Sequence, residues 1–176
     1  MKRDRNLHPL SWDHHSALTA IVMVRRQLVS PRPDAPITTL AREFVQFHRD
    51  ALIPHFRREE EWLLPRLLVH LSPEDIMVAR TLRDHIVIHR IVLELDRAVR
   101  KDRGVQPLLS ELVDRLEEHI RFEERELFVR AEACLPEDEL DSLGGLLHGA
   151  EQPAVVIPGS DGRPVRPGPP GDLAEA

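Results

Sequence analysis

Residues 109–127 read LSELVDRLEEHIRFEEREL, and this stretch decides the fold. Its apolar side chains recur at three- and four-residue spacing, at Leu109, Leu112, Leu116, Ile120 and Leu127. This spacing is typical of an amphipathic helix that buries one face. His119 and Glu123 lie four residues apart in the same apolar stripe, although polar groups are costly to bury without a partner. The stretch therefore predicts a core helix that carries a polar site.

Other stretches of the chain show the same helical spacing. The first expected helix runs from Ser11 to Val29, and the second from Thr38 to Leu71, with a kink expected at Pro54. The third starts at Ser72 as cap and Pro73 in the first turn, and ends near Lys101. The fourth runs from Pro107 to Cys134, and a short fifth runs from Pro136 to about Gly145. This order predicts an all-α fold, an up-down-up-down antiparallel four-helix bundle with a short C-terminal fifth helix.

The chain of 176 residues corresponds to about one domain. We expect residues 1–150 to form the bundle. The remaining segment, residues 151–176, contains six prolines and four glycines, and such a composition predicts a disordered tail.

Bulk properties exclude several classes of protein. Hydrophobic residues make up 41% and charged residues 31%, which excludes a wholly disordered chain. The net charge of −6 gives no reason to expect a nucleic-acid partner. No long uncharged apolar stretch and no signal peptide are evident, and Cys134 is the one cysteine, so we expect a cytoplasmic protein without membrane contact.

Seven candidate metal ligands fall in the apolar stripes of the four expected helices. The motif His-x-x-x-Glu occurs in the second and the fourth helix, and the third helix offers two histidines four residues apart. In the first helix, His14 is preferred to the adjacent His15 because it shares a helical row with Ile21 and Leu28. The candidates are His14, His55, Glu59, His85, His89, His119 and Glu123.

The candidates also agree in depth along the expected bundle. If successive helices run antiparallel, each candidate lies 12 to 18 residues from a neighbouring connection. Because an α-helix rises 1.5 Å per residue, all seven side chains are expected to meet in one layer.

Five imidazoles and two carboxylates form a nitrogen and oxygen donor set. This set suits iron, manganese or zinc better than copper(I) or an iron–sulfur cluster. Seven ligands are too many for one tetrahedral zinc, so we expect two metal ions, with Glu59 and Glu123 free to bridge them. The odd number of histidines predicts three imidazoles on one metal and two on the other, with an open position on the poorer one.

Four segments in this order resemble the hemerythrin-like, or HHE cation-binding, domain: Trp12–His15, His55–Glu60, Asp84–His85 and His119–Glu124. The resemblance covers roughly residues 8–147. It implies a four-helix bundle with two iron ions, Fe2+ or Fe3+ and oxo-bridged in some states, which bind O2 or a related ligand at one iron. It also implies the same seven ligands, with manganese and zinc as secondary candidates. Founding oxygen carriers have an aspartate five residues after the last histidine, where this chain has Glu123 at four and Glu124 at five.

Neighbouring polar residues are expected to support the ligands. Glu60 and Glu124 lie beside the ligand glutamates and are interpreted as solvated groups or as groups that orient imidazoles, since metal-bound histidines donate their other nitrogen to an acceptor. His48 lies two helical turns before His55 and is interpreted as a packing residue.

The sequence favours a protein that binds, senses, stores or carries O2, NO or iron, and that is not an enzyme. The first alternative is a di-iron oxidase or peroxidase. Ferritin-like di-iron enzymes carry Glu-x-x-His pairs, whereas no histidine here follows a glutamate by three residues, and the chain has no tyrosine for radical transfer. The second alternative is a metal-responsive regulatory module. A protein partner or a homodimer is left open.

Overall fold

The computed structural model describes residues 3–31 and 36–168, and 78% of the structure is helical. The first helical rod is α1 (His8–Val29), preceded by the 3-10 turn η1 (Arg5–Leu7). The second rod comprises α2 (Ile37–Phe47), η2 (His48–Leu52), α3 (Ile53–Arg58), η3 (Glu59–Leu63) and α4 (Leu64–His70). The third is α5 (Ile76–Arg100). The fourth comprises α6 (Val105–Phe122), η4 (Glu123–Leu127) and α7 (Phe128–Cys134), and α8 (Glu137–Gly149) follows it.

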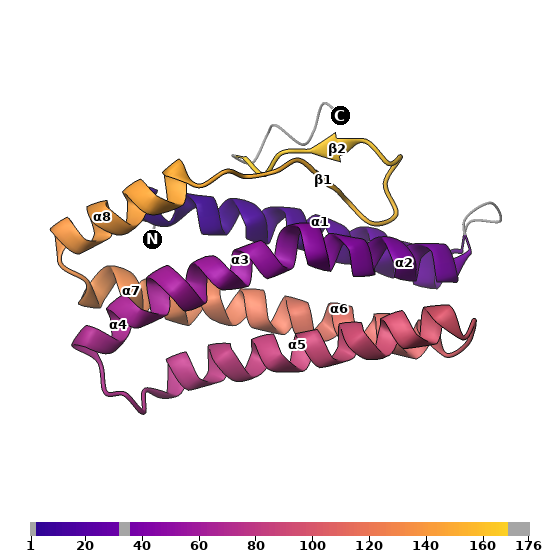
Figure 1. Ribbon diagram of the computed structural model, residues 1–176, viewed down its shortest axis with the longest axis horizontal. Helices are drawn as coiled ribbons and strands as arrows, with labels where there is room; N and C mark the ends of the chain where they lie inside the picture. The colour runs from indigo at the N-terminus through magenta and orange to yellow at the C-terminus, as the bar shows by residue number, and fades with distance from the viewer. Residues whose placement is uncertain (1–2, 32–35, 169–176) are drawn as a thin grey trace.

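The four rods lie alongside one another, and the chain reverses direction between consecutive rods (Figure 1). Helix α6 contacts both α5 and α1, and α2 contacts α5, so each rod packs against others along its length. This is the order of directions that an up-down-up-down bundle requires. Among the described residues, no helix is both long enough and apolar enough to cross a membrane.

The residue that caps α5 differs from the expected one. The side chain of Asp75 accepts hydrogen bonds from the backbone N–H groups of Met77 and Val78, so Asp75 and not Ser72 caps α5. The hydroxyl of Ser72 accepts from Glu74 N within the preceding turn. At the start of α6, the cap position is Gly104, whose φ of 72° is a conformation that glycine adopts without strain.

The expected kink at Pro54 coincides with a local change of helix type. The π-helical turn η2 directly precedes α3, in which Pro54 is the second residue. Proline lacks an N–H group and its ring crowds the preceding turn. A wider turn relieves that crowding, so the rod continues past the proline.

The hydrophobic core consists of two clusters of buried residues. One includes Phe44 and Leu95 in the half of the rods near the α1–α2 and α5–α6 connections, and the other includes Leu63 and Phe128 in the half near α8. Along each rod, the candidate ligands lie near the level at which residues of the first cluster give way to residues of the second. The polar layer therefore has apolar packing on both sides.

The expectation of a disordered tail is wrong for residues 151–168. Strand β1 (Val155–Val156) pairs antiparallel with β2 (Pro164–Val165), and this hairpin lies along α1 and α2 (Figure 1). Val155 and Ile157 are 3% and 5% exposed and pack into the first core cluster. Burial of these side chains offsets the entropy cost of ordering a proline-rich segment. Residues 169–176 lie outside the described part of the chain.

Candidate metal centre

Six of the seven predicted ligands meet in the space between the four helical rods. Helix α1 supplies His14, the second rod His55 and Glu59, α5 His85, and the fourth rod His119 and Glu123. Each of these side chains is at most 3% exposed. His15, the alternative to His14, is only partly buried and belongs to neither of the two groups that the ligands form.

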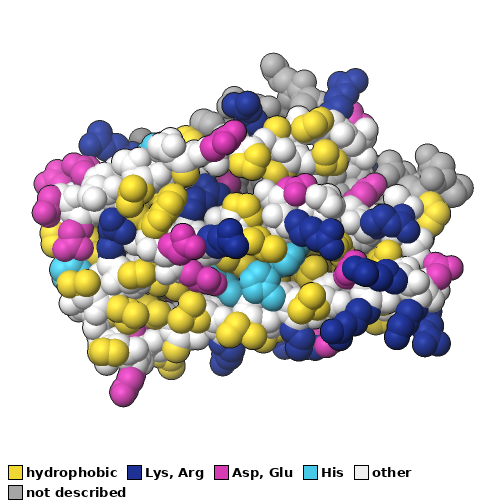
Figure 2. Space-filling view, in the orientation of Figure 1, with side chains coloured by type: hydrophobic (Ala, Val, Ile, Leu, Met, Phe, Trp, Pro, Cys, Tyr) yellow, Lys and Arg dark blue, Asp and Glu magenta, His cyan; other side chains and the backbone are white. Residues whose placement is uncertain are grey.

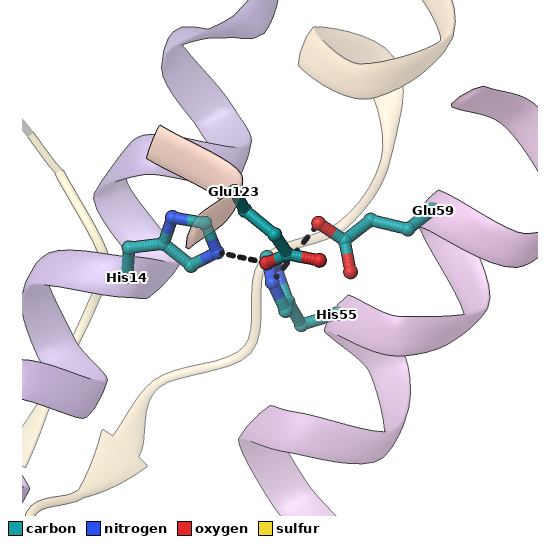
Figure 3. Close-up of side chains that lie close together, drawn as sticks. All are labelled: His14, His55, Glu59 and Glu123. Carbon is teal, nitrogen blue, oxygen red and sulfur yellow. Dashed lines mark ion pairs between the residues drawn. The ribbon is translucent and has the colours of Figure 1, made fainter. Parts of the chain in front are cut away.

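The six side chains form two groups that share both glutamates. In the first group, His14, His55, Glu59 and Glu123 offer ligand atoms that all lie within 4.8 Å of one another (Figure 3). In the second group, His85 and His119 take the place of the first two histidines and meet the same criterion with the same glutamates. Each group thus has two imidazoles and two carboxylates.

The shared carboxylates lie between the imidazoles of the two groups. Glu59 Oε1 is 3.4 Å from His55 Nε2, and Glu59 Oε2 is 3.3 Å from His85 Nε2. Glu123 Oε2 is 3.1 Å from His14 Nε2 and 3.3 Å from His119 Nε2. Both carboxylates are therefore placed to bridge two cations.

The hydrogen bonding of the ligand atoms shows whether a metal ion fits between them. The Nε2 atoms of all four histidines, and both carboxylate oxygens of Glu59 and of Glu123, are buried without a hydrogen-bond partner among the described residues. Buried polar atoms without partners are rare in native proteins, because their desolvation is not compensated. Imidazole nitrogens and carboxylate oxygens that converge in this way are suited to coordinate borderline and hard divalent cations.

Three of the four histidines have a carboxylate on the other ring nitrogen. Nδ1 of His14 lies 2.7 Å from Glu124 Oε1, and Nδ1 of His85 lies 2.7 Å from Glu60 Oε1. Glu124 and Glu60 are therefore placed to orient these imidazoles. Nδ1 of His55 lies 3.1 Å from Asp13 Oδ2. Such contacts fix Nδ1 as the donor and leave Nε2 for a metal.

Asp13 was missed by the sequence interpretation, although it directly precedes His14. It is held in place by Arg58, whose guanidinium donates a hydrogen bond of 2.5 Å to Asp13 Oδ2. Burial raises the pKa of Asp13 to about 6, against the lowering effect of Arg58. A local signal was present, because an acidic residue beside a histidine on a core helix is a candidate for this orienting role.

Both bridging glutamates begin π-helical turns. In η3 the backbone N–H of Leu64 bonds to the carbonyl of Glu59, and in η4 the N–H of Phe128 bonds to the carbonyl of Glu123, five residues apart in each case. Single π-helical turns within α-helices occur frequently at functional sites. No pattern in the apolar spacing predicted these turns.

The pKa values in the metal-free protein reflect the crowding of charges. Burial alone would lower the pKa of His14, but Glu123 and Glu124 beside its two nitrogens raise it to about 10. Burial lowers the pKa of His55 to about 3 and that of His119 well below the usual value. Burial, reinforced by the charge of Glu59, raises the pKa of Glu123 to about 8. The buried carboxyl groups and imidazoles thus shift one another's pKa values.

The structure does not bring His89 to the other candidates. Its Nδ1 lies 2.7 Å from His48 Nε2, and both residues line a surface pocket that also includes Val45. Figure 2 shows histidine side chains at the middle of this face. The ring of Phe56 stacks on His85 with centroids 3.9 Å apart and meets His89 edge-on at 5.4 Å, so it occupies the space between them. The expected division into three and two imidazoles is therefore wrong for the described groups, which have two each.

Comparison with known proteins gave one family. The model of the hemerythrin HHE cation binding domain matches residues 10–131, a range that contains all six clustered ligands. No curated protein and no solved structure matched the chain. The chain belongs to the hemerythrin HHE cation-binding domain family.

Proposed function

We propose that this protein is a non-haem di-iron protein that reversibly binds O2 or a related small ligand such as NO, in the service of sensing, storage or carriage. The observation that carries the proposal is the pair of two-histidine groups that share Glu59 and Glu123. Two imidazoles with carboxylate oxygens and open positions are typical of non-haem iron that takes up small oxygen ligands.

The proposed ligands divide evenly between the two ions. His14 and His55 would hold one ion, and His85 and His119 the other, with both carboxylates shared. Iron held by these residues would supply redox chemistry toward a small ligand. Four protein donors per ion leave room for that ligand.

Aromatic rings shield the site from water. Phe128 stacks on His14 with an interplanar angle of 5° and a centroid distance of 5.3 Å, and Phe56 stacks on His85 at 15°. Both rings are at most 2% exposed. Exclusion of water protects a bound ligand from proton leakage and side reactions, which favours reversible binding over turnover. The absence of tyrosine from the sequence supports the same choice, since no tyrosyl radical can form.

Anaerobic reconstitution with iron(II), followed by exposure to O2 and then to vacuum, tests the proposal. We expect two iron ions per chain and an absorption spectrum that appears with O2 and reverses when O2 is removed. The matched control is His70→Ala, because His70 lies on α4 and contacts Glu139 at 2.9 Å, away from both ligand groups. Irreversible oxidation with consumption of peroxide would instead support an oxidase or peroxidase. One zinc and no iron in protein from its own host would contradict the di-iron proposal.

A further inference from the structure

The two halves of the candidate centre repeat one arrangement of residues. An Asp-His pair on a single helix, Asp13-His14 on α1 and Asp84-His85 on α5, faces a His-x-x-x-Glu-Glu motif on the next rod. The supporting contacts cross between the halves, because Glu124 of the second motif holds His14 and Glu60 of the first holds His85. Corresponding residues of the two halves are therefore expected to have corresponding roles.

One contact of this arrangement is present in only one half. In the first half, Asp13 lies 3.1 Å from Nδ1 of His55. The corresponding residues in the second half are Asp84 and His119. Nδ1 of His119 is buried without a hydrogen-bond partner among the described residues, and the His119 side chain is 1% exposed. An orienting acceptor is missing at this one position.

Asp84 is held by weaker partners. Its carboxylate lies 3.5 Å from Arg80 Nε and 3.6 Å from a terminal nitrogen of Arg83, and its side chain is 22% exposed. These distances exceed those of good hydrogen bonds. Partly exposed ion pairs contribute little stability, so Asp84 is free to exchange them for a better donor.

The arginine beside the aspartate comes from a different helix in each half. In the first half Arg58, three residues after His55, holds Asp13. Phe122 occupies the corresponding place after His119, and the guanidinium carbon of Arg80 lies 3.9 Å from the centroid of its ring. A terminal nitrogen of Arg80 also lies 3.5 Å from Glu118 Oε1, and Glu118 directly precedes His119. The partner of Asp84 thus lies in the immediate surroundings of His119.

We propose that Asp84 is the positioning residue of His119 and accepts a hydrogen bond from its Nδ1–H when the centre holds metal. A metal on Nε2 fixes the proton on Nδ1, and this buried donor then requires an acceptor. The carboxylate turns from Arg80 to His119 and completes a set of four carboxylate–histidine pairs. The inference rests on the proposed two-metal site.

Thr81 is the rival acceptor. Its hydroxyl is buried without a hydrogen-bond partner among the described residues and lies one helical turn before His85. The residue at the corresponding place in α1 is Leu10, which has no polar atom, and His55 there uses an aspartate instead. The repeated arrangement therefore favours Asp84 over Thr81.

Cobalt(II) titration of the full-length metal-free protein tests the inference by calorimetry and by visible absorption. Asp84→Asn is expected to weaken one of the two cobalt equivalents by about ten-fold or more, the usual effect of removing an orienting partner. Thr81→Val is expected to bind both equivalents as the wild type does. The matched control is Asp96→Asn, which also removes an i,i+4 pair with an arginine on α5, with Arg100, but lies outside the ligand groups. Circular dichroism checks that every variant retains its helices.

A second measurement separates positioning from a structural effect. In zinc-loaded protein with 15N-labelled histidine, a ring N–H bonded to a carboxylate gives a strongly downfield proton signal. We expect four such signals in the wild type and the loss of one in Asp84→Asn. Unchanged cobalt affinity and four unchanged signals in Asp84→Asn would overturn the inference, and so would a selective effect of Thr81→Val. If the wild type itself binds fewer than two cobalt ions, the proposed two-metal site fails instead.

Discussion

His48 Nε2 lies 2.7 Å from His89 Nδ1, so the second histidine of α5 is paired with another imidazole outside both ligand groups. We therefore expect His89→Ala to retain two metal ions per chain, measured by elemental analysis after reconstitution. His85→Ala, one helical turn earlier, is expected to lose metal, because His85 Nε2 points at Glu59. Equal metal loss in the two variants would show that His89 is a ligand.

Replacement of a bridging glutamate is expected to remove the stabilisation by metal while leaving the metal-free fold nearly unchanged. Burial raises the pKa of Glu123, so the site tolerates a neutral group there, and an amide replaces the carboxyl group with little change in shape. For the wild type, free metal at a hundred times the Kd adds about 2.7 kcal/mol, which corresponds to roughly 5–10 °C in Tm. Scanning calorimetry of Glu123→Gln should show a metal-free Tm near that of the wild type and a much smaller increase with metal. A full increase would contradict a bridging role.

Metal binding at pH 7 is expected to release protons. The pKa of His14 is raised from 6.5 to about 10 by Glu123 and Glu124 despite burial, so this imidazole is protonated in the metal-free protein and must lose its proton to bind metal. Metal affinity should therefore rise with pH until His14 has titrated. The same shift affects the stability of the metal-free protein. Because the pKa of His14 is raised on folding, its protonation stabilises the fold fully below pH 6.5, and this contribution is lost as the pH rises towards 10. Calorimetry in buffers with different ionisation enthalpies measures the protons released, and identical heats in all buffers would contradict the prediction.

The C-terminal hairpin is expected to contribute to stability. Ile157 is 5% exposed in the first core cluster, and truncation of a buried isoleucine to alanine costs about 2 kcal/mol or more. Val156, its neighbour, is 39% exposed and provides the matched control, with a cost below about 1 kcal/mol for Val156→Ala. Urea unfolding followed by circular dichroism measures both. Equal, small effects would mean that the hairpin does not cover the core in solution.

The apolar periodicity of the sequence was sufficient to predict the helical rods and the inward orientation of six ligands. His119 and Glu123 lie in the stripe of Leu112 and Leu116, and all four are buried. The same argument failed for His89, because a stripe defines the direction of a side chain and not what fills the space before it. The ring of Phe56, from another rod, occupies that space.

The other differences between the predicted and the observed structure have similar physical causes. Ser72 and Asp75 are both good helix caps, and the backbone geometry that chooses between them depends on the packing of the connection. The prolines of the C-terminal segment suggested disorder, whereas Val155 and Ile157 are placed to cover a core that the local sequence does not specify. Tertiary contacts decide in both cases.

The π-helical turns at Glu59 and Glu123 each insert one extra residue into a rod. The wider turn absorbs the extra residue, so the apolar pattern of α4 and of α7 is shifted by one residue in the sequence relative to that of α3 and of α6. Deletion of one residue within η3 would restore an ordinary helix there and leave Leu63 and Leu67 facing the second core cluster, but it would remove the wider turn that begins at Glu59. The α-helical hydrogen-bond pattern is thus interrupted at the level of the two shared glutamates. The apolar pattern on one side of the centre matches the pattern on the other side only when this one-residue shift is included.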